Sequence, residues 1–272
     1  MLDIVIVSFN SQRVLDACLQ SLADTPPRRA HRIIVVDNAS SDGTVARLRE
    51  RWHGVEVIAL PGNRGFAAAN NAGIRASSGE LVLLLNPDTL VPSGAIDRLC
   101  DALMTHPSAA VAGPRLVDGD GRAELSFGAM IAPLAELRQK LLVVGNDRGF
   151  APIVRRVERM TRQPAEPDWV SGACLLIRRD ALERAGLLDE RFFMYTEDVD
   201  LCSAVRAQGR TILFVPDVQV THLRGRSAAT APRATRLGYR RSQVAFYEKH
   251  HPGIAPLLRL YLRARGEWPA AS

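Results

Sequence analysis

The stretch Leu81-Val82-Leu83-Leu84-Leu85-Asn86-Pro87-Asp88-Thr89 decides the fold of this chain. Its five consecutive apolar residues show no polar alternation, which is typical of a strand buried on both faces of a sheet. The run stops at an isolated carboxylate, Asp88. Because ligands of open α/β sheets bind outside the carboxyl ends of the strands, we expect Asp88 to hold a hard divalent cation against a diphosphate.

Similar apolar runs alternate with helical patterns through the first 112 residues. The further strands are expected at Ile4–Val7, Ile33–Val36, Val55–Leu60 and Ala109–Ala112. Apolar spacing predicts helices after Ser11, which can act as a cap, around Val45 to Trp52, over Phe66–Ala76 and over Ile96–Met104. This order indicates an α/β protein with a mostly parallel central sheet, flanked by helices and joined by right-handed crossovers.

The pattern changes after residue 112. Val117 to Gly121 is a hairpin signal, and an insertion follows at about 128–167, with helices expected at Leu134–Val144 and Ile153–Met160. The remaining predicted elements are a strand at Trp169–Ile177, a short helix at Asp180–Ala185, and closing strands at Ile212–Val215 and Val218–Thr221. We therefore expect three parts: residues 1–112, 113–225 and a C-terminal helical segment at 226–272.

Composition narrows the class of protein. The chain has 272 residues, 47% of them hydrophobic, which is enough to bury a substantial core. It contains no long apolar run, and its N-terminus enters a strand pattern at once, so we expect a cytoplasmic protein. The four cysteines form no CxxC pair, and we predict small buried side chains without a disulfide or a zinc site.

The net charge is +6, and all of the basic side chains except Lys140 and Lys249 are arginines. They concentrate at 155–162 and 224–265. Arginine suits phosphates and anionic lipid surfaces, and no nucleic-acid-binding module is recognisable, so we expect no nucleic-acid partner.

Polar side chains follow the predicted strands of the first half. Ser8 and Asn10 follow the first strand, and Asp37 follows the second. A carboxylate at position 37 can accept the imide N–H of uracil or thymine, or it can cap the next helix, although Asp42 fits the cap better.

A segment of small residues begins the third predicted helix. The segment contains Asn63, Arg64, Gly65 and Asn70. Its small residues either let the backbone approach a ligand, with Arg64 facing a phosphate, or allow close packing of the helix.

Three acidic residues begin a predicted helix at Glu197–Gln208, which Gly209 ends. Asp198 shares a face with Leu201, Cys202 and Val205 and should point inward, whereas Glu197 and Asp200 fall on a more polar face. The acidic side chains can simply favour the positive end of the helix dipole, with Thr196 as cap. Three carboxylates exceed that need, so we predict Asp198 as a general base, with Glu197 as second candidate.

These motifs resemble the successive signatures of the family-2 inverting glycosyltransferases. The matching blocks run in order from residue 3 to about 251 and are nearest to bacterial rhamnosyltransferases of cell-surface polysaccharide synthesis. They are Val5–Asn10, Val36–Thr44, Asn63 with Gly65-Phe66 and Asn70, Asn86–Thr89, Trp169–Cys174 and Phe192–Cys202.

The resemblance implies a GT-A fold, a nucleotide-sugar donor, and Mg²⁺ or Mn²⁺ bridging its diphosphate. Many members carry Asp-x-Asp where this chain has Asn86-Pro87-Asp88, so Asp88 is the strong ligand and Asn86 a weaker oxygen. His222 is either a further metal ligand, as in related enzymes, or a structural histidine. If His222 is so placed, Arg224 and Arg226 lie beside the diphosphate.

On the acceptor side, Trp169 and Tyr195 can stack on a sugar and Asp168 can accept a hydroxyl, or all three serve packing and loop polarity. His250 and His251 are expected at the surface. The basic amphipathic segment from Arg233 to Arg265 can lie on an anionic membrane, pack on the sheet, or form a homodimer contact.

The predicted reaction is a single displacement by an inverting, metal-dependent transferase that moves rhamnose from dTDP-rhamnose to a hydroxyl of a saccharide or lipid-linked acceptor. The alternatives are a UDP-hexose donor and a non-catalytic nucleotide-sugar-binding subunit. A dinucleotide-dependent oxidoreductase ranks last, because no GxGxxG follows Val7.

Overall fold

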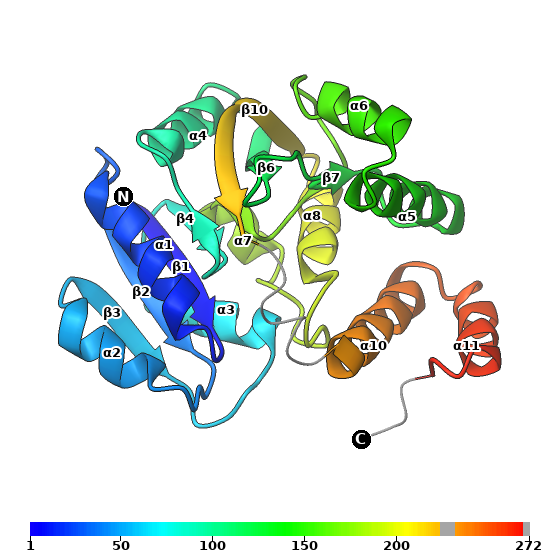
Figure 1. The fold of residues 1–272 in the computed structure, drawn as a ribbon, viewed down its shortest axis with the longest axis horizontal. Coiled ribbons are helices and arrows are strands. Elements are labelled where there is room, and N and C mark those ends of the chain that lie inside the picture. The colour runs from blue at the N-terminus through cyan, green and yellow to red at the C-terminus, as the bar shows by residue number, and fades with distance from the viewer. Residues whose placement is uncertain (224–231, 269–272) are drawn as a thin grey trace.

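A computed structural model describes residues 1–223 and 232–268, and its centre is an eight-stranded sheet (Figure 1). The strand order is β3-β2-β1-β4-β9-β6-β10-β5. Their bounds are β1 Leu2–Ser8, β2 His31–Asp37, β3 Val55–Ala59, β4 Leu81–Leu85, β5 Thr89–Leu90, β6 Ala109–Val117, β9 Cys174–Arg178 and β10 Thr211–His222.

The sheet is parallel in its N-terminal half and mixed beyond it. Strands β3, β2, β1 and β4 pair in parallel, as do β6 and β10. Strand β9 runs antiparallel to β4 and β6, and the short β5 runs antiparallel to β10. The carboxyl ends of β1, β2 and β4 therefore meet at one edge, where the sequence places its polar side chains.

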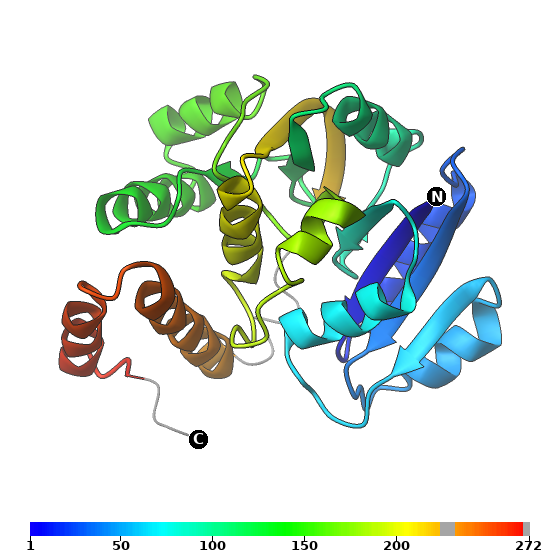
Figure 2. The same cartoon turned by 180° about the vertical axis from the view of Figure 1, so that it is seen from behind.

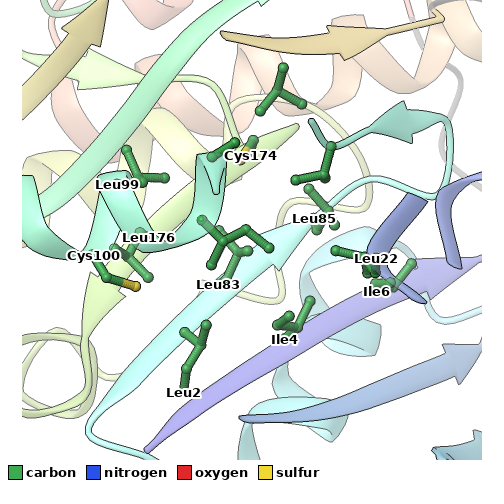
Figure 3. Close-up of a cluster of buried hydrophobic side chains, with 14 of the residues drawn as sticks. Leu2, Ile4, Ile6, Leu22, Leu83, Leu85, Leu99, Cys100, Cys174 and Leu176 are labelled. Carbon is green, nitrogen blue, oxygen red and sulfur yellow. The ribbon is translucent and has the colours of Figure 1, made fainter. Parts of the chain in front are cut away.

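Helices cover both faces of the sheet (Figures 1 and 2). One face is covered by α1 (Gln12–Asp24), α2 (Thr44–Arg51) and α4 (Ala95–Met104), and the other by α3 (Phe66–Ala76), α7 (Arg179–Arg184) and α8 (Glu197–Ala207). Alternate strand residues point to opposite faces, so Leu2, Ile4 and Ile6 pack in one core (Figure 3), while Val5 and Val7 pack in the other.

The remaining elements lie at one end of the molecule (Figures 1 and 2). A two-stranded sheet, β7 (Phe127–Gly128) with β8 (Trp169–Val170), flanks the helical pair α5 (Pro133–Asp147) and α6 (Ala151–Met160). Helices α10 (Pro232–His250) and α11 (Ala255–Ala264) form a small apolar cluster with Phe192 and Val199. The insertion is thus helical, at the positions that its apolar spacing predicts.

Three local predictions are wrong. The strand predicted at Trp169–Ile177 is broken into β8 and β9, because the chain turns at Gly172 to leave the small sheet and join the large one. The two closing strands are one strand, β10, with a bulge after Val215. Ser11 gives no side-chain cap to α1, because its hydroxyl bonds that of Ser8 at 2.8 Å.

All four cysteines are buried and free, as predicted. Burial raises the pKa of the Cys18 thiol to about 12 and that of Cys100 to about 11, so neither is a reactive thiolate near neutral pH. Across residues 1–223 and 232–268, the structure contains no helix with the length and apolarity needed to span a bilayer.

Candidate active site

Asp88 and His222 meet at the carboxyl edge of the sheet. The antiparallel pairing of β5 with β10 sets His222 opposite Thr89, and the Leu223 N–H donates to the Asp88 carbonyl at 2.8 Å. His222 Nε2 consequently lies 3.3 Å from Asp88 Oδ1. Both residues are predicted metal ligands, and the fold brings them together.

Glu124 is a member of this site that the sequence did not reveal. It follows the hairpin turn, where its backbone N–H donates to the Leu116 carbonyl, and its side chain is buried. Glu124 Oε2 lies 3.2 Å from His222 Nδ1. A carboxylate in a turn-rich segment carries no sequence signal of a distant histidine, so the tertiary structure alone identifies it.

The two carboxylates control the charge of the imidazole. Burial lowers the pKa of His222, but the hydrogen bonds to Asp88 and Glu124 outweigh it and raise the pKa from 6.5 to about 9. Without a cation, the histidine is thus protonated at neutral pH and bridges two carboxylates.

The donor set fits a hard divalent cation. Asp88 supplies a carboxylate and His222 an imidazole. Asn86 faces His222 Nε2 with its amide Nδ2 at 3.5 Å, and its buried Oδ1 has no hydrogen-bond partner within the described residues. Within 1–223 and 232–268, no three His, Cys, Asp or Glu side chains form a metal-binding group. So thin a set suits Mg²⁺ or Mn²⁺ that takes its other ligands from water and substrate phosphates.

Asp37 ends β2 with one oxygen unused. Its carboxylate is buried; Oδ2 accepts the Ser40 N–H at 2.9 Å, while Oδ1 has no partner in the described part of the chain. Asp42, by contrast, accepts the Thr44 N–H and hydroxyl and the Gln12 N–H. Asp42 therefore orders the turn before α2 (Thr44–Arg51), but the N-cap residue is Gly43 and no side chain caps the helix, so the prediction of Asp42 as the cap is wrong. Asp37 keeps one oxygen without a partner in the described residues.

Asn10 orders the loop beside Asp37. Its φ is +49°, and its Oδ1 accepts the Ser41 N–H at 2.8 Å. This bond and the one that the Asn10 N–H donates to the Ser40 hydroxyl at 2.9 Å join the loops that follow β1 and β2, while the Ser8–Ser11 hydroxyl contact lies within the first of these loops.

The segment before α3 is held by Asn38, whose role no sequence pattern indicates. The Asn38 amide donates to Asn63 Oδ1 and accepts the Arg64 N–H, each at 2.9 Å. Gly65 follows with φ +86°, and a Cβ there would overlap the Phe193 carbonyl. Gly65 is therefore required where this segment passes the loop that leads to α8.

Two neighbours of this segment have structural partners. Arg64 extends to Glu190, 3.2 Å away, and Asn70 donates to the Phe66 carbonyl at 2.9 Å. Arg64, which was predicted to face a phosphate, thus forms an exposed ion pair in this structure.

Asp198 begins α8 and points to the turn that separates β8 from β9. Its Oδ2 accepts the Gly172 N–H at 2.8 Å, and the next residue, Ala173, accepts the Asn86 N–H at 2.9 Å. One short segment, Gly172-Ala173, therefore joins Asp198 to the loop that carries Asp88. Burial raises the pKa of Asp198 despite backbone N–H donors from Gly172 and Val199.

Glu197 and Asp200 are buried whereas Asp198 is partly exposed, so the prediction that Glu197 and Asp200 lie on a more polar face than Asp198 is wrong. Burial and the neighbouring Asp198 raise the pKa of Glu197 well above its ordinary value, and Glu197 Oε2 has no hydrogen-bond partner in residues 1–223 and 232–268.

Helix α10 covers Asp200, a contact that the periodicity of the sequence does not predict. Lys249 and His250 reach Asp200 at 2.9 and 2.7 Å. His251 bonds the Ile131 carbonyl at 2.7 Å. Both histidines are partly exposed, so they lie at the surface as predicted, but each has a structural hydrogen-bond partner.

The three candidate acceptor residues lie around the same turn and helix. Trp169 donates its indole N–H to the Ala129 carbonyl at 2.9 Å. Asp168 is engaged by Arg206 at 2.8 Å and by the Met130 N–H at 2.7 Å, which favours the structural alternative for this residue.

Tyr195 and Thr196 are consecutive left-handed residues, with φ values of +73° and +65°. Tyr195 packs edge-on against Tyr239, with ring centroids 6.0 Å apart. Strained backbone of this kind persists only where surrounding contacts impose it, and it is common beside functional groups. The remaining candidates, Arg224 and Arg226, lie outside the described residues.

Residues 3–186 match the family model described as Glycosyl transferase family 2. The chain is 30% identical to the N-acetylglucosaminyl-diphospho-decaprenol L-rhamnosyltransferase of Mycobacterium tuberculosis over 93% of this chain and 86% of that protein. It is 24% identical to the dTDP-rhamnosyl transferase RfbF of Shigella flexneri over 81% of this chain and 68% of that protein.

Among solved structures, the mannosyltransferase PcManGT from Pyrobaculum calidifontis, in complex with GDP-Man and Mn²⁺, superposes with a TM-score of 0.61 at 20% identity. The match covers 94% of this chain and 67% of that one. GalNAc-T7 with UDP, GalNAc and Mn²⁺ gives a TM-score of 0.61 at 18% identity, covering 82% and 43%. These similarities confirm the fold that the sequence motifs implied.

Proposed function

Since this chain belongs to glycosyl transferase family 2, has the GT-A fold and is a glycosyltransferase, we propose that it is an inverting rhamnosyltransferase that uses dTDP-rhamnose. The observation that carries the proposal is the joining of Asp198 to the Asn86–Asp88 loop through Gly172 and Ala173. Asp198, as the base, and the Asn86–Asp88 loop, as the diphosphate site, lie on either side of the segment Gly172-Ala173. This arrangement suits an in-line displacement.

Asp198 would act as the base. Its carboxylate accepts the proton of the acceptor hydroxyl while that oxygen attacks the anomeric carbon from the face opposite the nucleotide. The bond between the anomeric carbon and the diphosphate oxygen breaks, the diphosphate keeps the electron pair, and the anomeric centre inverts. The proton on Asp198 then passes to solvent.

Asp88 and His222 would hold Mg²⁺ or Mn²⁺, with Asn86 Oδ1 as a third donor. A divalent cation there supplies charge stabilisation for the departing diphosphate. Glu124 orients the imidazole through Nδ1, so that Nε2 faces the Asp88 side.

The assignment of the sugar donor rests on the Asp37 side chain and on the names of related proteins. Asp37 Oδ1 is a buried, unused acceptor that suits the imide N–H of thymine or uracil. Pyrimidine recognition does not separate dTDP-rhamnose from a UDP-hexose. Relatives named as rhamnosyltransferases, one of them as a dTDP-rhamnosyl transferase, favour dTDP-rhamnose.

The acceptor class follows from the same relatives. The mycobacterial protein is named for a lipid-linked acceptor, N-acetylglucosaminyl-diphospho-decaprenol. We therefore propose a saccharide carried on a lipid diphosphate at the cytoplasmic face of a membrane, and a role in cell-surface polysaccharide synthesis.

A ligand panel tests the donor directly. Thermal unfolding is measured with dTDP-rhamnose, UDP-glucose and GDP-mannose, each with and without Mn²⁺, because a ligand that binds only the folded state raises Tm. The proposal expects the largest Mn²⁺-dependent rise with dTDP-rhamnose, and Asp37→Asn should reduce it. Asp101→Asn, at an exposed ion pair, is the matched control. A larger rise with GDP-mannose would overturn the donor assignment.

A further inference from the structure

Helix α5 is apolar on its solvent side. Leu134, Leu137, Leu141 and Val144 follow one another at helical spacing and are 83%, 55%, 60% and 44% exposed. Four aliphatic residues on one exposed stripe differ from the scattered apolar side chains of an ordinary surface.

The inward side of the same helix carries polar residues. The Gln139 amide donates to the Phe127 carbonyl at 3.1 Å, and the Asn146 amide donates to the Ala123 carbonyl at 2.9 Å. A surface helix usually buries its apolar side and exposes its polar side. In α5 this arrangement is partly reversed, because two amides bond inward while three leucines and Val144 face outward.

Arginines surround the stripe. Helix α6 packs close to α5 where Ile153 contacts Gly145, and Arg156 of α6 and Arg138 of α5 border a hollow lined by the leucines of α5. Five exposed arginines near the stripe pair with no carboxylate in the described residues: Arg138, Arg148, Arg155, Arg156 and Arg159. We call these arginines, together with the four aliphatic residues, the α5 surface.

We propose that the α5 surface docks on an anionic phospholipid bilayer. Aliphatic side chains can enter the region between headgroups and acyl chains, while arginines contact the lipid phosphates, and the two contributions reinforce each other. A second copy of this chain is a poorer partner, because a symmetric contact would bring two sets of unpaired arginines together.

Helix α5, which carries most of the α5 surface, lies on the far side of α8 from the strands and helices of residues 1–76, as both views of the ribbon show (Figures 1 and 2). The two-stranded sheet of β7 and β8 links it to the Gly172 turn that contacts Asp198. If the proposed function holds, a bilayer docked at this surface would bring a lipid-linked acceptor to the side of the active site where Asp198 lies.

Vesicle flotation tests the docking surface with the full chain. The Leu134→Ser/Leu137→Ser/Leu141→Ser variant should bind vesicles of phosphatidylcholine and phosphatidylglycerol roughly tenfold or more weakly than the wild type, because the apolar contact is lost. Arg155→Gln/Arg156→Gln should weaken binding by about fivefold for each arginine removed. Unchanged thermal unfolding and unchanged Mn²⁺-dependent nucleotide binding would show that both variants keep the fold and the active site.

The matched control lies on α11. Leu257→Ser/Leu260→Ser removes two equally exposed leucines from the C-terminal helix, and binding should remain within about twofold of the wild type if α5 makes the contact. Three results would overturn the proposal: wild-type binding that does not depend on phosphatidylglycerol, full binding by the α5 variant, or loss confined to the α11 variant. Failure to bind vesicles would leave nucleotide binding and sugar transfer unaffected, so it is distinguishable from failure of the proposed function.

Discussion

The imidazole Nε2 of His222 lies 3.3 Å from the Asp88 carboxylate, and its Nδ1 lies 3.2 Å from Glu124. Asp88 and His222 meet at the edge of the sheet because β5 pairs with the end of β10, and Glu124 reaches them from the segment that returns along β6 through the bond of its N–H to the Leu116 carbonyl. A histidine fixed at one nitrogen by a carboxylate and facing a second carboxylate with the other is prepared to share a cation with it.

Weakening this arrangement should lower metal affinity. We expect Glu124→Gln to reduce Mn²⁺ affinity by about 10–100-fold, because an orienting partner of the ligand is weakened, and Asp88→Asn to reduce it further. Paramagnetic resonance of free Mn²⁺ measures the affinity without turnover. Asp24→Asn, at an exposed contact with Gln20, should leave affinity unchanged. Equal Mn²⁺ affinity in wild type and Asp88→Asn would exclude this site.

Glu197 should make folding depend on pH. Its folded pKa is raised above 4.5, so its contribution to stability is fully present below that value and is lost as pH rises through the folded pKa. Glu197→Gln removes a carboxyl whose ionisation is disfavoured in the folded state and should therefore raise Tm at neutral pH, while the difference from wild type should shrink below pH 4.5. Thermal melts across pH measure both. A variant less stable than wild type at neutral pH would contradict the sign.

Asp198 should shape the pH dependence of transfer. Burial raises its pKa above 3.8, and the base must be ionised, so kcat/KM should fall as pH decreases through this raised value. Because Glu197 is adjacent and its pKa is also raised, the acid limb belongs to the pair. Initial rates at saturating Mn²⁺ measure the limb, and an acid limb that stays at pH 3.8 would contradict it.

Gly65 should tolerate no side chain. A Cβ there would lie 2.8 Å from the Phe193 ring and closer to its carbonyl, at a φ of +86° that other residues rarely adopt. We expect Gly65→Ala to lower the free energy of unfolding by about 3 kcal/mol. Gly62→Ala in the same loop meets no atom within 4 Å and should change it by less than about 1 kcal/mol. Equal denaturation midpoints would show that the close approach is not maintained in solution.

Glu136 should hold α10 against α5. Its carboxylate accepts the hydroxyls of Tyr239 and Tyr247 and the amide of Gln243, and it pairs with Lys140. We expect Glu136→Ala to cost about 3 kcal/mol, because buried donors lose a charged acceptor, and to speed proteolysis within α10. Glu248→Ala removes an exposed ion pair with Arg259 and should cost less than about 1 kcal/mol. Similar cleavage rates in the two variants would contradict the role of Glu136.

Sequence patterns predicted the elements whose stability is local. The span of α3 and that of β4 are as predicted, because an uninterrupted apolar run or helical spacing decides them without distant contacts. The proximity of Asp88 and His222 was also accessible, through the likeness to a known family. Periodicity alone does not specify a pairing across the sheet.

The misassigned positions depend on tertiary contacts. Glu197 and Asp200 look polar on a helical wheel, but the former is enclosed and the latter is covered by Lys249 and His250 of α10. Glu124 and Asn38 lie in turn-like sequence, and their roles come from partners far along the chain. The break at Gly172 arises because the chain changes sheets, which no alternation pattern records.

The most direct test of the central claim is the rate of sugar transfer by Asp198→Asn with dTDP-rhamnose and Mn²⁺, measured beside donor affinity and beside Glu197→Gln. If Asp198 is the base, Asp198→Asn should lower kcat by roughly 10²–10⁴-fold with donor affinity retained, and Glu197→Gln should lower it far less. Transfer by Asp198→Asn at the wild-type rate would contradict the account.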